Sequence, residues 1–215
     1  MLKVIPTILT DNPSELKVML GRVEEATDMV QIDIIDGIFT NNKTIDPKTL
    51  EYIETNLNLD FHLLTKEPIN WVESCIHAQA YRITANIEMM TSQREFMEKV
   101  QSVGCKVGLG LNYETPIEAV DHSILTDLDV VLLMSIHEVG FGGKQFQSGI
   151  FEKIKELDGL RKKDSTPFSI LIDGGVKAEV IGKLGSLGVN EVVVGRRLFN
   201  GDLRGNIEEL EKLAQ

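Results

Sequence analysis

Two aspartates and a glutamine lie at the end of an apolar run in the segment VQIDIIDGIF, residues 30–39. Gln31 and Asp33 are two residues apart, so in a β-strand their side chains point to the same face. Asp36 follows at the point where a loop would begin. A carboxylate in such a place can transfer a proton or bind a cation, but it is also a common turn former. Taken alone, Asp33 is better explained as a turn residue.

Polar side chains also follow several of the other apolar runs. Thr7, His62, Asn86 and Asp173 each come at or after the end of such a run. If the runs are parallel strands of one barrel, these ends meet at a single mouth. Two carboxylates and an imidazole, from Asp33, Asp173 and His62, would then form a metal site or an acid/base set. The combination favours a functional site over three unrelated turns.

Three loops with glycines follow the sixth, seventh and eighth apolar runs. Their glycines are Gly142, Gly143, Gly174, Gly175 and Gly195. In an eight-stranded barrel, the loops after the last strands are the usual place where backbone N–H groups hold a phosphate. One glycine alone would indicate only a tight turn. All of them together favour a phosphorylated ligand, and Arg196 is either a further phosphate contact or a solvated surface arginine.

Short β-rich runs alternate with segments whose apolar residues recur every three to four positions, which is typical of parallel strands joined by helices. The predicted strands are Lys3–Leu9, Met29–Ile34, Asn58–Leu64, Ala80–Ile83, Lys106–Leu111, Val130–Met134, Ser169–Ile172 and Glu191–Val194. The predicted helices are one opened by Asn12 and Pro13, then Pro47–Thr55, Asn70–His77, Ser92–Ser102, Ile117–Ser123, Gly149–Leu157, Ala178–Leu187 and Asn206–Ala214. Eight strands close a barrel, so we expect one α/β domain, a (β/α)8 TIM barrel over residues 1–215. An open doubly wound sheet is the alternative, because strand order cannot be read from one sequence.

Composition excludes several kinds of partner. The net charge of −11 disfavours a nucleic-acid partner, and no apolar run reaches the length of about 18 residues that a membrane span needs. The N-terminus does not have the pattern of a signal peptide, so we expect a cytoplasmic protein. Cys75 and Cys105 have no metal or redox spacing and are expected to be small apolar residues of the interior. A homo-oligomer stays open.

Eight ordered segments of the chain resemble the ribulose-phosphate 3-epimerases. PTILT (6–10) is similar to PSILS, QIDIIDGIFTNN (31–42) to HxDxMDGxFVPN, FHLLTKEP (61–68) to DxHLMxxxP and ITANIE (83–88) to ITxHxE. GLGLNYETP (108–116), VLLMSIHEVGFGGKQF (131–146), IDGGV (172–176) and VVVGRRLF (192–199) resemble the later motifs in the same order. Single motifs are weak, but eight in order are highly specific. The fold that the resemblance implies is a ribulose-phosphate-binding TIM barrel.

The resemblance implies a sugar-phosphate isomerase. The family interconverts D-ribulose 5-phosphate and D-xylulose 5-phosphate by moving the proton at C3. Carried over by position, Asp33 and Asp173 are the two acid/base carboxylates, and the metal ligands are Gln31, Asp33, His62 and Asp173. A divalent metal, zinc, iron or manganese, would stabilise the negative charge of the enediolate. The substrate contacts that follow from the loops and the resemblance are Thr7, Asn86, Met134, Gly142, Gly143, Gly174, Gly175, Gly195 and Arg196.

The departures from the family pattern lie at the site itself. Gln31 and Asn86 stand where the family has histidines, and Arg196 stands where it has a serine. A carboxamide oxygen suits harder ions than zinc, so the metal is weakened, changed or lost. Loop six carries an extra residue, and His137 within it is more simply a surface residue than a substitute ligand.

Two alternatives to this epimerase stay open. The first is a sister activity on another ketose phosphate, although the run from Asp33 to Asp36 does not have the DxKxxD signature of the decarboxylase and hexulose-phosphate synthase branch. The second is a barrel that binds a sugar phosphate without turnover. The retained pair Asp33 and Asp173 favours the enzyme.

Overall fold

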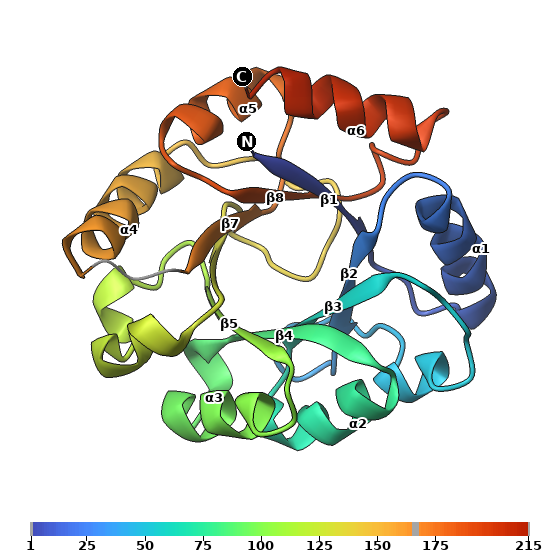
Figure 1. Ribbon diagram of the computed structural model, residues 1–215, viewed down its shortest axis with the longest axis horizontal. Coiled ribbons are helices and arrows are strands. Elements are labelled where there is room, and N and C mark those ends of the chain that lie inside the picture. The colour runs from blue at the N-terminus through green and yellow to red at the C-terminus, as the bar shows by residue number, and fades with distance from the viewer. Residues whose placement is uncertain (1, 165–167, 215) are drawn as a thin grey trace.

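Eight parallel strands close into a barrel, each paired with the next in chain order and β8 paired with β1. This computed structural model describes residues 2–164 and 168–214. The strands are β1 (Lys3–Ile8), β2 (Met29–Ile35), β3 (Asn58–Leu64), β4 (Ala80–Asn86), β5 (Lys106–Leu111), β6 (Val130–Met134), β7 (Ser169–Asp173) and β8 (Glu191–Val194). The predicted (β/α)8 fold is confirmed, and the open sheet is excluded because β8 pairs with β1 (Figure 1).

Helices surround the barrel and cover the outer face of its sheet (Figure 1). They are α1 (Pro13–Glu24), α2 (Val72–His77), α3 (Gln93–Gln101), α4 (Ile150–Asp164), α5 (Ala178–Ser186) and α6 (Leu203–Lys212). The start of α1 is as predicted: the Asn12 side chain accepts hydrogen bonds from the N–H groups of Ser14 and Glu15, and Pro13 is in the first turn. The outward side chains of the strands and one face of each helix form a single apolar layer, which holds the surrounding helices against the barrel.

Two of the predicted helices are wrong. Pro47–Thr55 contains only the short 3-10 helix η1 (Pro47–Leu50), because its buried residues, Pro47 and Leu50, are three apart while Tyr52 is 89% exposed. Ile117–Ser123 is replaced by the 3-10 helices η4 (Ile117–Ala119) and η5 (His122–Asp127). There the Asp121 carboxylate accepts a hydrogen bond from the Ser123 N–H, which starts a new turn inside the predicted helix.

The helix predicted over Asn70–His77 begins as the 3-10 helix η2 (Pro68–Trp71) and continues as α2. A further 3-10 turn, η3 (Ile87–Met89), follows β4 directly. β4 itself runs on to Asn86, three residues beyond its predicted end at Ile83. The site residue Asn86 is therefore held by the sheet rather than by a loop.

The interior of the barrel has an apolar side and a polar side. Apolar side chains from β1, β6, β7 and β8 pack together inside it, among them Ile5, Leu132 and Leu171. On the other side, β2, β3 and β4 place Gln31, Asp33, Asp60, His62 and Arg82 in the interior, all of them buried. Buried polar groups need partners, so this side of the interior can hold an ordered polar network.

A buried ion cluster lies deeper in the barrel than the polar strand ends. The Arg82 guanidinium contacts the carboxylates of Asp60 at 2.7 Å and Glu191 at 2.8 Å. Removal of one partner from such a cluster is strongly destabilising because it leaves a buried charge unpaired. The cluster therefore joins β3, β4 and β8 inside the barrel, beneath the residues at the carboxyl ends of the strands.

Among the helices of the described residues, none has the length and apolar character that would let it cross a membrane. Cys75 is buried, and burial raises the pKa of its thiol above the ordinary range. Cys105 is half-buried, and its Sγ contacts the carbonyl oxygen of Ala80 at 3.2 Å. Both cysteines thus have the packing role that was expected of them.

Candidate active site

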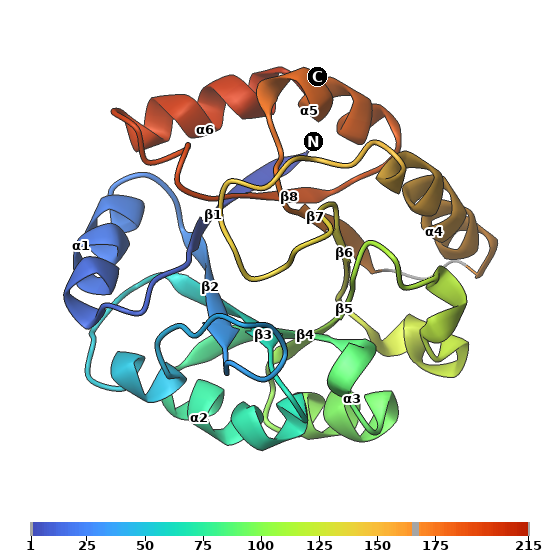
Figure 2. The ribbon, with the colours of Figure 1, turned by 180° about the vertical axis from the view of Figure 1, so that it is seen from behind.

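The carboxyl ends of the strands surround a cavity of about 890 Å³. Figure 2 shows the loop between β6 and α4, residues 135–149, crossing this mouth of the barrel. Thr7, Asp33, His62, Met134 and Asp173 line the cavity. The glycines predicted from the sequence, Gly142, Gly143, Gly174, Gly175 and Gly195, line it as well, together with Arg196. Its size is within the usual range for small-molecule sites.

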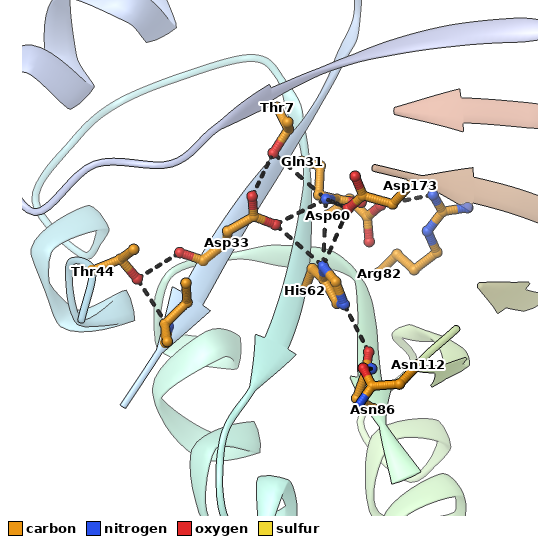
Figure 3. Close-up of polar contacts among 11 residues, drawn as sticks. Thr7, Gln31, Asp33, Thr44, Asp60, His62, Arg82, Asn86, Asn112 and Asp173 are labelled. Carbon is orange, nitrogen blue, oxygen red and sulfur yellow. Dashed lines mark hydrogen bonds and ion pairs between the residues drawn. The ribbon is translucent and has the colours of Figure 1, made fainter. Parts of the chain in front are cut away.

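Asp33, His62 and Asp173, which all line this cavity, lie side by side (Figure 3). Asp33 and His62 are direct partners in the register of β2 and β3, and Asp173 is the last residue of β7. His62 Nδ1 is 3.2 Å from Asp33 Oδ1 and 3.5 Å from Asp173 Oδ2. One ligand atom from each of the three residues lies within 4.8 Å of the other two. The sequence prediction that these three side chains come together is confirmed.

Gln31 lies just below this group and is fully buried. Its Nε2 donates hydrogen bonds to Asp33 Oδ1 and Asp173 Oδ2, both at 2.9 Å (Figure 3). The same nitrogen is 3.5 Å from His62 Nδ1. Among the described residues, the amide oxygen Oε1 has no hydrogen-bond partner. A buried acceptor without a partner costs about 1–3 kcal/mol. The amide is nevertheless oriented this way because its nitrogen then donates to two carboxylates.

Asn86 and Asn112 hold His62 from the other side. His62 Nε2 is 2.9 Å from Asn86 Oδ1, and Asn86 Nδ2 donates to Asn112 Oδ1 at 2.9 Å. Because Asn86 Oδ1 can only accept, the Nε2 position carries a proton, and Nδ1 faces the two carboxylates. A Cβ on Gly110 of β5 would lie 2.4 Å from Asn86 Oδ1, so only glycine leaves room for this contact. Asn86 is absent from the cavity lining, and its assignment to substrate binding stays a prediction.

Threonines fix the orientation of Asp33. Thr7 Oγ1 donates to Asp33 Oδ2 at 3.1 Å. Thr44 Oγ1 donates to the backbone oxygen of Asp33 at 2.7 Å and accepts from the N–H of Ile35 at 2.9 Å. No strand pattern signals the role of Thr44, because this residue lies in the loop after β2.

Asp36, the second aspartate of the opening segment, has a different role from Asp33. Its Oδ1 accepts from the N–H groups of Ile38 and Phe39, and its Oδ2 accepts from the N–H of Lys66. These bonds tie the loop after β2 to the loop after β3. Asp36 is outside the cavity lining, and its three hydrogen bonds give it the role of supporting the loop.

Burial and close charges shift the ionisation of the site. Burial raises the pKa of Asp33 above its ordinary value, while the hydrogen bond from His62 opposes the shift. For His62, burial alone would lower the pKa, but the hydrogen bonds to Asp173 and Asp33 outweigh it and raise the pKa to about 10. At neutral pH, His62 in the metal-free site therefore carries a second proton, on Nδ1, which faces the two carboxylates.

The far end of the cavity is rich in glycine and positive charge. A Cβ on Gly175 would lie 2.6 Å from the backbone nitrogen of Phe146, and one on Gly142 would lie 2.8 Å from the Arg196 guanidinium. Arg196 thus packs directly over the loop after β6. The lining also contains cations that the sequence patterns did not single out, Lys43, Lys144, Lys177 and Arg197. With Arg196 the lining has five cations against four acidic residues, Asp11, Glu15, Asp33 and Asp173. In a chain with a net charge of −11, this local balance favours an anionic ligand.

His137 is not part of the metal-ligand group. Its Nδ1 forms an ion pair with Glu114, and its ring lies edge-on against Tyr113 with centroids 4.7 Å apart. The loop that carries it is tied to the loop after β2, because Asn42 Nδ2 donates to the Gly140 oxygen at 2.6 Å. His137 therefore helps to shape the loop over the cavity.

The donor set fits a divalent metal. Two carboxylates and an imidazole nitrogen are common metal ligands, and the Asn86 contact orients the ring so that Nδ1 faces the carboxylates. Gln31 has an oxygen that no described residue uses. Two of these four side chains must change before they can bind a metal: the Gln31 amide must turn to present its oxygen, and His62 must lose its Nδ1 proton.

The fold and the site define a (β/α)8-barrel protein with two carboxylates at its mouth. The model of the ribulose-phosphate 3 epimerase family matches residues 3–199. A ribulose-phosphate 3-epimerase of Bacillus subtilis is 32% identical over 215 residues and covers 98% of both chains. A chloroplastic ribulose-5-phosphate-3-epimerase of Arabidopsis thaliana is 34% identical over 205 residues, which cover 91% of this chain and 71% of the relative.

The chain therefore belongs to the ribulose-phosphate 3 epimerase family, and the class of enzyme is a carbohydrate epimerase. The resemblance seen in the sequence motifs is confirmed. The solved structure of 3-keto-L-gulonate-6-phosphate decarboxylase from Vibrio cholerae matches with a TM-score of 0.71 at 13% identity, over 99% of this chain and 97% of that one. At this identity the likeness shows only a shared fold.

Proposed function

We propose that this protein interconverts D-ribulose 5-phosphate and D-xylulose 5-phosphate by moving the proton at C3. The observation that carries the proposal is the pair Asp33 and Asp173. Both carboxylates line the cavity, and they approach the same two nitrogens, Gln31 Nε2 and His62 Nδ1, from different strands. Inversion at a carbon by proton transfer needs a base on one side and an acid on the other, and this pair supplies both.

The two carboxylates share Gln31 and His62 as partners but differ in one contact. Thr7 donates only to Asp33, and both Asp33 and Asp173 accept from Gln31 Nε2. One of the two removes the proton from C3, and the protonated partner returns a proton on the opposite face. The roles of Asp33 and Asp173 exchange when the reaction runs in the other direction.

A divalent metal held by Asp33, His62, Asp173 and Gln31 would supply positive charge against the negative charge that develops on the sugar oxygens. The chain itself contributes orientation at this place. The bond from His62 Nε2 to Asn86 fixes the ring, and Thr44 fixes the backbone of Asp33. Buried partners of this kind hold ligands and acid/base groups in one geometry.

The phosphate group of the sugar belongs at the glycine-rich end of the cavity. Gly174, Gly175 and Gly195 allow backbone N–H groups to approach an anion closely, and Arg196 adds a guanidinium over Gly142. Met134 contributes an apolar wall near the reacting carbons. We propose these residues and Thr7 as the substrate contacts.

The test is NMR in D2O on chelator-treated protein with D-ribulose 5-phosphate, with and without added Zn²⁺, Mn²⁺ or Fe²⁺. We expect deuterium at C3 and the appearance of D-xylulose 5-phosphate. Exchange that needs added metal would support the metal-dependent form of the proposal, and exchange without metal would indicate that the carboxylates act alone. Related ketose phosphates in the same assay test a sister activity.

A second candidate is a barrel that binds a sugar phosphate without turnover. One observation favours it: the amide of Gln31 already bridges the two carboxylates, in the place where the family resemblance puts a metal-binding histidine. The same NMR samples separate the two candidates. Saturable binding of the sugar phosphate, with no deuterium at C3 under any metal condition, would support the binder.

A further inference from the structure

We infer that the Gln31 amide is a two-position switch, in which Nε2 bridges Asp33 and Asp173 without metal and Oε1 faces the ion when a metal is bound. This inference rests on the proposed metal site. Its second part is a change of preference: compared with a histidine at the same position, Gln31 shifts the site away from Zn²⁺ and towards oxygen-seeking ions such as Mn²⁺ and Mg²⁺.

The metal-free position of the amide follows from the contacts of its nitrogen. Nε2 is 2.9 Å from one oxygen of Asp33 and 2.9 Å from one oxygen of Asp173. If the amide were turned over, its oxygen would face two carboxylate oxygens at that distance, which is repulsive. The N–H donors therefore serve, in the metal-free protein, the two carboxylates that a cation would otherwise neutralise.

A cation between the carboxylates reverses this preference. The N–H groups of the amide carry partial positive charge and would then face an ion, whereas the oxygen end would be attracted to it. On the side away from the carboxylates, Oε1 has no hydrogen-bond partner among the described residues. After the turn the N–H groups would lie on that side, so the attraction between the amide oxygen and the ion has to outweigh the loss of their two acceptors. No existing hydrogen bond of Oε1 is broken when the two ends exchange places.

The choice of ion follows from the donor atom. Imidazole nitrogen suits zinc, while carbonyl and carboxylate oxygens suit manganese and magnesium. With Gln31 the set is three oxygen donors and one nitrogen, from Asp33, Asp173, Gln31 and His62. A histidine at position 31 would change it to two of each. Absolute affinities favour zinc over manganese at almost any such site, so the informative quantity is the ratio of the two.

The first measurement is the side-chain amide of Gln31 in ¹⁵N-labelled, chelator-treated protein, identified by its absence from the spectrum of Gln31→His. We expect its two protons to be shifted downfield and slow to exchange without metal, and to lose both properties when Zn²⁺ or Mg²⁺ saturates the protein. Gln101 is the control in the same spectrum, because it is exposed on α3 and donates to the Asp127 oxygen at 2.7 Å. A Gln31 signal that stays unchanged at saturating metal would overturn the switch.

The second measurement is calorimetric titration of the wild type, Gln31→His and Gln101→His with Mn²⁺ and Zn²⁺, without substrate. We expect Gln31→His to raise the ratio of zinc affinity to manganese affinity at least about tenfold. Substitutions of residues around a metal typically change metal affinity by about 10- to 100-fold. Gln101→His should leave the ratio unchanged. An equal ratio in wild type and Gln31→His, or no metal binding by the wild type, would overturn the inference.

These experiments contain no sugar phosphate, so their failure is separate from failure of the proposed reaction. A protein that shows the amide switch but no exchange at C3 would keep the inference and lose the epimerase. A protein that exchanges C3 with an immobile amide would keep the epimerase and lose the switch.

Discussion

Replacement of Asp33 by asparagine should separate the two halves of the proposed proton transfer. The asparagine side chain has nearly the same shape, so it can stay between Thr7 and Gln31, which contact the two oxygens of Asp33. It cannot take or give a proton at C3. Asp173 on β7 is still present and still reaches the cavity from its own side. The variant therefore keeps one of the two faces active.

Because Asp33 is also a proposed metal ligand, both proteins are compared at saturating metal, where the expected loss is that of one acid/base group. Such a group contributes about 10²- to 10⁴-fold to the rate, which corresponds to about 3–5 kcal/mol in activation free energy. Binding should change much less, because the glycine loops and Arg196 that we assign to the phosphate are not in contact with Asp33. We therefore expect kcat to fall by that factor while KM changes by a few-fold at most.

The assay is NMR in D2O started separately from each of the two pentulose phosphates. With Asp33→Asn, one of the two sugars should still exchange its C3 hydrogen without inversion, because Asp173 faces it. Asp173→Asn is the matched variant and should exchange the other sugar instead. If both variants exchanged the same sugar, or if either one kept full interconversion, two carboxylates acting on opposite faces would be refuted.

Further substitutions test the surroundings of the site. Arg196→Ser restores the residue of the family pattern, and steady-state kinetics should show KM raised about 10- to 150-fold with kcat nearly unchanged, since a charge-assisted contact contributes about 1.5–3 kcal/mol. Asn86→Leu leaves the His62 Nε2 proton without an acceptor, so calorimetry should show metal affinity reduced about 10- to 100-fold while circular dichroism stays unchanged. At Asp158, burial raises the pKa, but ion pairs with Lys162 and Arg161 outweigh it and lower the pKa below 3.8. That contribution to stability is present above pH 3.8 and is lost as the pH falls through the lower folded value, so the urea midpoints of the wild type and Asp158→Asn should differ at pH 7 and converge near pH 2.

The strands could be predicted closely because each is a short apolar run with turn residues at its ends. β3, β5, β6 and β8 have the predicted bounds. The helices predicted after β2 and β5 were wrong, because apolar residues three positions apart are compatible with a 3-10 turn as well as with an α-helix. In both segments the outcome depended on local details, such as the exposure of Tyr52 and the turn that Asp121 caps.

The parts of the site that depend on strand geometry could be predicted from the sequence. The period of two placed Gln31 and Asp33 on one face, and the barrel brought Asp173 to the same mouth. The contact between Gln31 Nε2 and Asp173 joins residues 142 positions apart, and no local pattern contains it. The same is true of Asn86, whose place behind His62 depends on the empty space over Gly110 of the neighbouring strand.

The two amides that replace the histidines of the family pattern act on one residue. Gln31 Nε2 lies 3.5 Å from His62 Nδ1, and Asn86 Oδ1 lies 2.9 Å from His62 Nε2. An amide does not titrate, so at these three positions His62 is left as the one side chain that can carry a positive charge against Asp33 and Asp173. With amides at positions 31 and 86, His62 is the one imidazole left to titrate among these three positions. It follows that Gln31→His and Asn86→His should not act additively on metal affinity, since both change the partners of the same ring.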